Sequence, residues 1–398
     1  MSYKKVKISD IGKIVSGATP KTKDVDNYGG SIAWITPADL SGYTSKYISH
    51  GSRNITQKGY DSCSTHLMPR GTVLFSSRAP IGYVAIAENP ICTNQGFKSI
   101  VPNDDIDSEF LYYQLQYLRK KIQEKGSGTT FKEISGKVLG ETDIVVPSLE
   151  EQSRIVARIE ELFSELDKAV DTLKTTKEQL EVYRQAVLVD IFSQEHPLRQ
   201  LKEISVALSG FAFKSKNYTP DGKYTVIKIG NVKDGYLDFS RDKTRTNEVT
   251  DRILQKYLLK QGDCLITLTG TRGKRDYGFV SMIERQTDYL LNQRVAALRF
   301  DTMIALPEFF RYYLSSLNYR NQFFKYETGN VGQGNVGIKA LCEPAVPCPP
   351  LDTQKKIVDQ ISDRLSVCDS IEKTVDTALA QADAMRQSIL KQAFEGKL

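Results

Sequence analysis

The sequence predicts an α+β protein with two tandem mixed α/β domains, separated by two long helices that pair as an antiparallel coiled coil. Three observations lead to this prediction. The chain has 398 residues, which is too long for one ordinary core and suggests two to three domains. Several segments occur twice in the same order. Two stretches, near 149–193 and 351–395, contain no Pro or Gly, as expected of uninterrupted helices.

The internal repeat pairs the two halves of the chain segment by segment. "SDIGKIVSG" from Ser9 parallels "KEISVALSG" from Lys202, and "GTVLFSSR" from Gly71 parallels "GDCLITLT" from Gly262. Farther on, "EFLYYQL" parallels "EFFRYYL". Between matching strands the first copy has "SSRAPI", whereas the second has the longer "TLTGTRGKRDY". We therefore expect one framework that carries different loops.

Residues 1–146 and 196–348 are predicted to be the two globular domains. Each contains short Val/Ile-rich runs, such as "TVLFS" and "YTVIKI", between Gly, Pro and Asn residues. Each also contains one amphipathic helix, around 110–122 in the first copy and 309–323 in the second. This alternation indicates a mixed α+β domain.

Residues 147–195 and 349–398 are predicted to be the spacer helices, which begin at the related phrases "VPSLEEQSRIV" and "PCPPLDTQKKIV". A run of about 43 residues would span about 65 Å. Matching heptads favour an intramolecular antiparallel pair, although each helix could instead wrap its own domain. The predicted packing residues are Ile159, Leu162, Leu166, Leu173, Leu180 and Val187 in the first helix, and Ile361, Cys368, Ile371, Val375, Met385 and Ile389 in the second.

The composition fits a folded cytoplasmic protein. No apolar run reaches the roughly 20 residues of a membrane helix, and "MSYKKVKISD" does not resemble a signal peptide. The six cysteines form no CxxC pair and no zinc-ligand spacing with His, so we expect free thiols and no metal site. The net charge of +6 permits a polyanion partner without requiring one.

Motifs of catalysis are weak in this sequence. The three histidines lie in no nucleophile or metal context, and no P-loop motif occurs. "GQGNVG" from Gly332 satisfies GxGxxG, but a Pro soon follows and a flexible loop is the simpler interpretation. "PDGKYTVIK" resembles a nuclease motif but has Val226 where an acid would hold the metal, and no Asn/Asp-Pro-Pro-Tyr/Phe segment is present. We therefore expect a non-catalytic protein.

Polar and glycine-flanked loops are the candidate contacts to nucleic acid. Arg, Lys, Asn and Gln can pair with base edges, and Gly allows close approach to phosphates. Any one of these residues could instead be a solvated side chain, and the recurring Asn-Gln pair could serve the framework. Because the copies should read different sequences, Arg272, Lys274 and Arg275 in the insertion are better candidates than Asn292. The candidates are Lys21, Lys23, Ser76, Ser77, Arg78, Thr93, Asn94, Gln95, Lys98, Ser127, Thr129, Thr130 and Lys132 in the first copy, and Lys214, Lys216, Arg272, Lys274, Arg275, Asn292, Gln293, Arg294, Asn330, Gln333 and Asn335 in the second.

The whole chain resembles the specificity subunit of type I restriction-modification systems. The resemblance is carried by the "P-[SP]-L-x-x-Q-x-x-IV" helix starts at Pro147 and Pro349, the "GDxL" strand at Gly262, the "NQ" element, and the ending "QSILKQAFEGKL". The helix starts and the ending are specific signals, whereas "NQ" and "GDxL" are weak. "IFSQEH" at 191–196 departs from the corresponding "AFEGKL", which leaves the end of the first helix uncertain.

This resemblance implies a non-catalytic subunit whose two target recognition domains each read one half of a split site in double-stranded DNA. It also implies binding of two modification subunits, which hold S-adenosylmethionine and methylate adenine, and of restriction (motor-nuclease) subunits. No cofactor and no membrane contact are expected for this chain. The alternatives are a coiled-coil adaptor that joins two ligand-binding domains without binding DNA, and a stand-alone methyltransferase.

Overall fold

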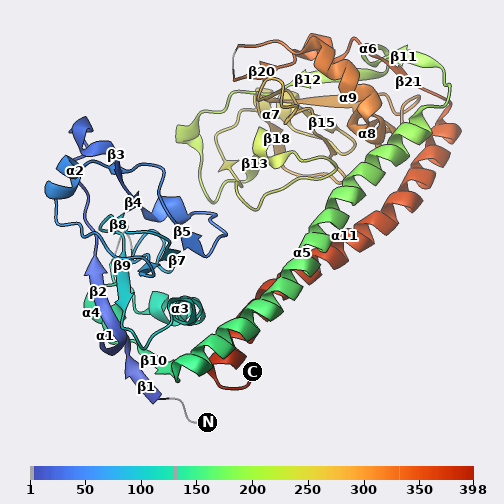
Figure 1. Ribbon diagram of the computed structural model, residues 1–398. Coiled ribbons are helices and arrows are strands. Elements are labelled where there is room, and N and C mark those ends of the chain that lie inside the picture. The colour runs from blue at the N-terminus through green and yellow to red at the C-terminus, as the bar shows by residue number, and fades with distance from the viewer. Residues whose placement is uncertain (1–3, 129–131, 331) are drawn as a thin grey trace. The chain divides into compact units, whose positions relative to one another are not determined.

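The computed structural model describes residues 4–128, 132–330 and 332–398, and the chain forms two compact units. Unit 1 comprises residues 1–173 and 377–398, and unit 2 comprises residues 174–376. Two long helices, α5 (Leu149–Phe192) and α11 (Leu351–Phe394), run from one unit into the other (Figure 1). Each unit therefore combines one globular domain with an end of both helices.

Unit 1 is built around a sheet with the strand order β2-β9-β6-β7-β5. β2, β9, β6 and β7 pair antiparallel, and β5 joins β7 in parallel. Two smaller pairs, antiparallel β1–β10 and parallel β4–β8, accompany this sheet. The bounds are β1 (Lys4–Lys7), α1 (Ile8–Ile11), β2 (Gly12–Ser16), β3 (Tyr28–Ile32), β4 (Trp34–Ile35), β5 (Tyr47–Ile48), α2 (Gln57–Asp61), β6 (Val73–Phe75), β7 (Val84–Ala87), β8 (Cys92–Thr93), β9 (Lys98–Pro102), α3 (Ser108–Glu124), α4 (Gly136–Gly140) and β10 (Asp143–Val146).

Unit 2 repeats this plan, with a sheet of order β12-β19-β15-β17, an antiparallel pair β11–β21 and a parallel pair β13–β18. Two further antiparallel pairs, β13–β14 and β16–β20, occur in this copy. The bounds are β11 (Leu198–Gln200), α6 (Leu201–Ile204), β12 (Ser205–Ser209), β13 (Tyr224–Ile227), β14 (Arg245–Thr246), α7 (Asp251–Tyr257), β15 (Cys264–Thr267), β16 (Thr269–Gly270), β17 (Val280–Met282), β18 (Tyr289–Leu291), β19 (Val295–Phe300), α8 (Pro307–Ser315), α9 (Leu317–Phe323), β20 (Gly334–Asn335), α10 (Ile338–Leu341) and β21 (Ala345–Pro347).

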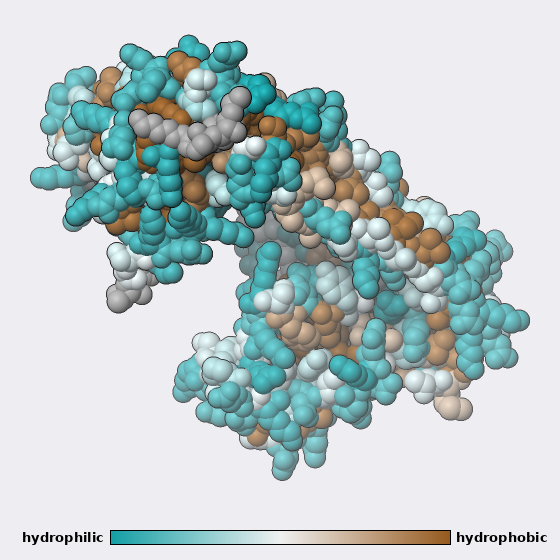
Figure 2. Space-filling view, turned by 90° about the horizontal axis from the view of Figure 1, so that it is seen from below, coloured by the Kyte–Doolittle hydropathy of each residue, from teal (hydrophilic) through white to brown (hydrophobic). Residues whose placement is uncertain are grey.

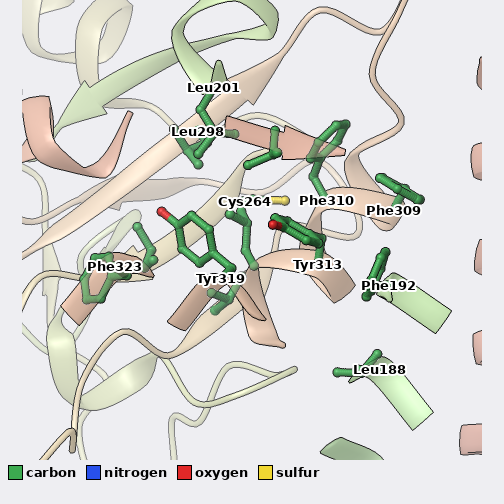
Figure 3. Close-up of a cluster of buried hydrophobic side chains, with 14 of the residues drawn as sticks. Leu188, Phe192, Leu201, Cys264, Leu298, Phe309, Phe310, Tyr313, Tyr319 and Phe323 are labelled. Atoms are coloured by element: carbon green, nitrogen blue, oxygen red, sulfur yellow. The ribbon is translucent and has the colours of Figure 1, made fainter. Parts of the chain in front are cut away.

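Both cores are closed by a phenylalanine at the end of a long helix. In unit 2, Phe192 of α5 meets Phe309 and Tyr313 of α8 edge to face, with ring centroids 5.4 and 5.1 Å apart (Figure 3). In unit 1, Phe394 of α11 lies 5.4 Å from Phe110 and 5.6 Å from Tyr117 of α3. Aromatic pairs at such spacings are favourable beyond their burial of apolar surface. Each globular domain is thus sealed by the end of the helix that belongs to the other copy.

Ion pairs show that α5 and α11 run antiparallel. Asp167 pairs with Arg386 within unit 1. In the further ion pairs, the residue number of the α11 partner falls as that of the α5 partner rises. Within unit 2, these further pairs are Lys177 with Asp376 at 2.7 Å, Arg184 with Asp369 at 2.7 Å, and Asp190 with Arg364 at 3.1 Å. The predicted antiparallel coiled coil is confirmed, and each unit holds a part of it.

The seam between the helices is narrow. Among the predicted packing residues, Ile159, Val187, Ile361, Cys368 and Val375 are buried. The structure departs from the prediction at Ile371 and Met385, whose side chains are 40% and 54% exposed. A helix with a single helical neighbour buries only one stripe, so heptad positions at the edge of the stripe remain in solvent. The remaining predicted packing residues, Leu162, Leu166, Leu173, Leu180 and Ile389, are half-buried.

The glutamine of the repeated phrase fixes each long helix to its own domain. The Gln152 side chain is fully buried; it accepts from the Asp107 amide at 2.8 Å and donates to the carbonyls of Asp105 and Pro147. Gln354 does the same in unit 2, accepting from the Leu306 amide at 2.7 Å and donating to the carbonyls of Ile304 and Pro349. Replacing such a buried, hydrogen-bonded amide by an apolar side chain therefore lowers the stability of the fold.

Candidate nucleic-acid interface

In unit 1, main-chain hydrogen bonds bring three predicted loops side by side. The Ser77 amide donates to the Gly96 carbonyl at 2.7 Å, and the Ser77 carbonyl accepts from the Ile134 amide at 3.0 Å. Arg78 then faces Glu133 as an isolated bridge, with an ion pair at 3.6 Å. The loops at 76–81 and 94–98 and the described residues 126–128 and 132–134 therefore lie side by side.

Unit 2 repeats this arrangement with other side chains. The Leu268 amide donates to the Arg294 carbonyl at 3.1 Å, and the Leu268 carbonyl accepts from the Val336 amide at 2.9 Å. Beyond Leu268, β16 pairs with β20 through Thr269 and Asn335. The loops at 268–277 and 292–294 and the described residues 329–330 and 332–336 thus meet as their counterparts do in unit 1. We call each set of three loops the loop platform of its unit.

A glycine loop lies against the Asn-Gln element at one side of each platform. A Cβ on Gly17 would come within 2.2 Å of the carbonyl oxygens of Thr93 and Asn94, and one on Gly210 within 2.0 Å of the Asn292 oxygen. Glycine is required at both positions because no side chain fits there. The Asn94 side chain accepts from the Gly96 amide at 2.8 Å. Asn94 therefore has a framework bond in this structure.

The side chains of the first platform differ in their exposure. The structure departs from the predicted contacts at Ser76, Ser77 and Thr93, which are buried. The Ser76 hydroxyl is used inside the loop, since it donates to the Pro80 carbonyl and accepts from the Tyr83 amide, both at 2.7 Å. Thr129 and Thr130 lie outside the described residues. Exposed candidates are Lys21, Lys23, Gln95, Ser127 and Lys132, and half-buried ones are Arg78, Asn94 and Lys98.

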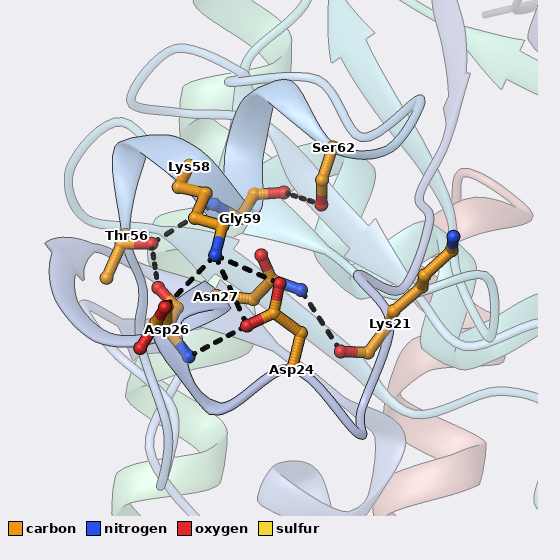
Figure 4. Close-up of polar contacts among 8 residues, drawn as sticks. All are labelled: Lys21, Asp24, Asp26, Asn27, Thr56, Lys58, Gly59 and Ser62. Atoms are coloured by element: carbon orange, nitrogen blue, oxygen red, sulfur yellow. Dashed lines mark hydrogen bonds and ion pairs between the residues drawn. The ribbon is translucent and has the colours of Figure 1, made fainter.

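The segment that carries Lys21 and Lys23 has an anchored backbone. The Asn27 side chain donates to the Lys21 carbonyl at 3.1 Å, while Lys58 pairs with Asp24 at 3.0 Å and Asp26 at 3.1 Å (Figure 4). The hydrogen bond from Lys58 lowers the pKa of Asp24. The Lys21 ammonium points away from this cluster in Figure 4. An exposed cation on a fixed main chain suits contact with a phosphate.

The predicted contact residues of the second copy are more exposed than those of the first copy. Every candidate of this copy is exposed or half-buried. Arg272 donates to the Gly329 carbonyl at 2.7 Å, and Arg275 donates to Asn321 at 3.0 Å and lies 5.3 Å from the Phe324 ring. The Lys274 amide donates to the Thr271 carbonyl at 3.1 Å, while its ammonium forms no hydrogen bond or ion pair with a described residue. The exposed set is Lys214, Lys216, Arg272, Lys274, Arg275, Gln293, Arg294, Asn330 and Gln333, and the half-buried set is Asn292 and Asn335.

Sequence reasoning missed the residues that hold the second platform together. Tyr277 is fully buried and donates its hydroxyl to Glu327 at 2.8 Å, and Arg320 donates to main-chain carbonyls of the insertion. Burial, followed by the hydrogen bond to Glu327, raises the pKa of Tyr277, so its hydroxyl stays protonated. The sequence signal that could have pointed to Tyr277 is its place at the end of a Gly-containing insertion that the first copy lacks.

Among the described residues, neither a metal-binding cluster nor a membrane-spanning helix is found. No group of three or more His, Cys, Asp and Glu within ranges 4–128, 132–330 and 332–398 is placed to hold a metal ion. Of the helices that can be described, none has the length and apolarity to cross a membrane. The face drawn in Figure 2 is mainly hydrophilic, with hydrophobic residues in limited patches.

Comparison with known proteins gives matches over both halves of the chain. The type I restriction modification DNA specificity domain matches residues 2–182 and again residues 195–381. The MjaIX specificity subunit of Methanocaldococcus jannaschii is 46% identical over 177 residues, covering 44% of this chain and 40% of that protein. The chain thus spans less than half of that relative. The Escherichia coli EcoBI specificity subunit is 23% identical over 426 residues, covering all of this chain and 86% of that subunit.

A solved structure from work on complex assembly and conformational transition of the type I R-M system has the same fold. It superposes with a TM-score of 0.71 at 18% identity and covers 100% of this chain and 98% of its own. At this identity the likeness concerns the fold alone. Together with the family domain found in both halves, it leads to one conclusion: the chain belongs to the type I restriction-modification specificity subunits, with two target recognition domains.

Proposed function

We propose that this chain gives a type I restriction-modification complex its specificity for a bipartite DNA site, with one loop platform reading each half-site. The observation that carries the proposal is the shared platform frame: the same main-chain bonds around Ser77 and Leu268 present different polar side chains in the two copies. A common frame with different loops suits two readers of different sequences.

Domain exchange tests the assignment of one half-site to each copy. The chain is assembled with its modification subunits in cells, and methylated adenines are mapped across the genome. Replacing residues 1–146 by the corresponding domain of another family member should change one half-site and leave the other unchanged. A change in both half-sites would contradict the assignment, and the unexchanged chain provides the reference pattern.

The spacer between half-sites is proposed to depend on the length of α5 and α11. Residues 173–179 and 375–381 each contain one partner of the ion pair between Lys177 and Asp376. Deleting both segments removes one heptad from each helix and keeps the two helices in register. The accepted spacer should shorten while both half-sites keep their sequences. Deleting only residues 173–179 is the control, because it breaks the register and should abolish assembly.

The modification subunits are proposed to dock on an apolar face of the helical pair. Val182 of α5 is 71% exposed, and Val367 and Ile371 of α11 are 59% and 40% exposed. Val367 and Ile371 are four residues apart and so share one face of α11. The ion pair of Arg184 with Asp369 places them at the height of Val182. Exposed apolar residues at one height of the helical pair support an interaction surface there.

A charge on this face should weaken assembly. Val367→Asp is expected to reduce copurification of the modification subunits by about tenfold or more, since an unpaired carboxylate would be buried at the interface. Ser362→Asp, at an exposed position about 140° around the same helix from Val367, is the matched control. Equal assembly of both variants would contradict this docking face.

The modification subunits are proposed to bind S-adenosylmethionine and to methylate adenine, so this chain itself carries out no catalytic step. Restriction subunits are proposed to join the same complex.

A further inference from the structure

The cationic insertion of unit 2, residues 271–276, is closed at its base by one carboxylate. Glu327 Oε1 accepts from the Tyr277 hydroxyl at 2.8 Å and from the Gly273 amide at 3.4 Å. Tyr277 ends the insertion and Gly273 lies near its tip. Glu327 itself belongs to the neighbouring loop of the platform. A single side chain thus ties the tip and the C-terminal end of the insertion to the loop beside it.

A second group holds the other side of the insertion. Arg320 of α9 donates to the carbonyls of Arg275, Tyr277 and Gly278 at 3.0, 3.1 and 3.2 Å. Within the loop, Asp276 accepts from the Thr271 amide at 2.7 Å. The insertion is therefore fixed through its main chain, while the side chains of Arg272, Lys274 and Arg275 remain exposed.

The packing at this base is tight. A Cβ placed on Gly334 would lie 2.4 Å from Glu327 Oε1, 2.9 Å from the Tyr277 hydroxyl and 3.1 Å from the Arg272 Cα. The three groups therefore converge on one point of the β16–β20 pair. A side chain that moved Glu327 would also move the backbone of Arg272.

The carboxylate has an electrostatic cost. Glu327 lies among Arg272, Lys274 and Arg275, the cations assigned to DNA, where a negative charge opposes phosphate binding. Its benefit is that the loop is already ordered before binding, which reduces the ordering cost of association. We propose that Glu327, with Tyr277 as its donor, is a positioning residue that gives unit 2 its half-site specificity at the expense of non-specific affinity. This inference rests on the proposed function, because it assumes that unit 2 reads one half-site.

The test measures binding of the complete complex with its modification subunits to four duplexes. One carries both half-sites, two have one or the other half-site scrambled, and the fourth has both half-sites scrambled. Tyr277→Phe and Glu327→Ala should each lower the preference for the intact second half-site by about tenfold. Glu327→Gln keeps an acceptor oxygen and should keep this preference. Both Glu327 variants should bind the doubly scrambled duplex more tightly than the wild type, whereas Tyr277→Phe should not.

The controls separate positioning from folding. The preference for the first half-site should be unchanged in all variants, and Tyr277→Phe combined with Glu327→Ala should lose no more than either alone. Tyr236→Phe, at an exposed tyrosine of the same unit, should behave as wild type. An unchanged second half-site preference in Tyr277→Phe, or an equal loss at both half-sites, would overturn the inference. A wild type with no preference at either half-site would instead refute the proposed function itself.

Discussion

The two units share their frame but differ in the side chains placed on it. The bonds of Ser77 to Gly96 and Ile134 recur at Leu268 with Arg294 and Val336, and Gln152 recurs as Gln354. The connection after the central strand is short in unit 1 and becomes a braced cationic loop in unit 2. The comparison teaches that main-chain bonding and core closure define the fold, whereas the platform loops are free to differ.

The units also differ where the globular domain meets α5. In unit 1, Lys46 pairs with Glu109 at 2.8 Å, contacts Glu160, and lies 5.6 Å from the Tyr113 ring. The corresponding face of α8 in unit 2, with Arg311 and Tyr312, lines a cavity of about 640 Å³. One domain is clamped to its helix by charge, and the other leaves a polar cavity at the same place.

The shared core closure can be broken separately in each unit, which is the largest effect we expect. Phe394→Ala should destabilise unit 1, and Phe192→Ala should destabilise unit 2, each by about 3–5 kcal/mol, because a buried ring is replaced by a cavity. Hydrogen exchange followed peptide by peptide reports each unit separately. Faster exchange in the core of unit 2 after Phe394→Ala, with unit 1 unaffected, would refute the assignment of the ring to unit 1.

The two buried glutamines should respond equally if the frame is shared. Gln152→Leu and Gln354→Leu each leave an amide and two carbonyls without partners, so a loss of about 2–3 kcal/mol is expected in the unit concerned. Chemical unfolding with a probe in each unit measures the loss. Gln360→Leu, on the exposed side of α11, serves as the control and should change stability little. A strong loss for one glutamine and none for the other would show that the frames are not equivalent.

The clamp of unit 1 predicts a pH dependence of the stability of that unit. Burial opposes charge on Glu109, but hydrogen bonds from Lys46 and Tyr47 outweigh it and lower the pKa of Glu109. The hydrogen bonds with Glu109 and Glu160 likewise outweigh burial and raise the pKa of Lys46. The contribution of Glu109 is therefore present above its ordinary value of 4.5 and is lost as pH falls toward the lowered value.

Lys46→Met tests this clamp. At neutral pH the variant should lose about 1 kcal/mol in unit 1, and the difference from wild type should shrink as the pH falls below 4.5. Because the raised pKa of Lys46 keeps its charge past the ordinary 10.5, no loss is expected at moderately alkaline pH. Acid unfolding monitored in α3 is the measurement. Lys233→Met in unit 2 is the matched control, and a difference that stays constant down to low pH would contradict the clamp.

The lateral ion pairs of the helices should give the smallest effects. Arg184→Gln in unit 2 and Arg386→Gln in unit 1 each remove pairs at the surface of the coiled coil, for which about 0.2–1 kcal/mol is expected. Thermal unfolding at low and high salt measures this, and salt should erase the difference. An effect that persists in high salt would mean that these arginines act through packing instead.

Much of the architecture could be predicted because repeats and heptads are visible in sequence. The two tandem domains and the paired helices follow from periodicity, which reports which faces are apolar. The burial of Ser76, Ser77 and Thr93 could not be predicted, because a polar residue after a strand can face either solvent or the main chain of a neighbouring loop. The same limit hid Gln152 and Glu327, whose partners are remote in sequence. The exposure of Ile371 and Met385 depends on the number of elements that pack against α11. A heptad pattern does not predict this number.

The position of Phe394 also sets the order in which the protein can mature during synthesis. Phe110 leaves the ribosome early, whereas the Phe394 ring that covers it arrives only after the second domain has been translated, at about 5–20 residues per second. The nascent first domain therefore waits with an uncovered aromatic surface while the second domain is made. Phe192, by contrast, emerges before Phe309, so the second domain can close as soon as its own strands and helix are complete. The domain that is translated first is consequently the one that finishes folding last.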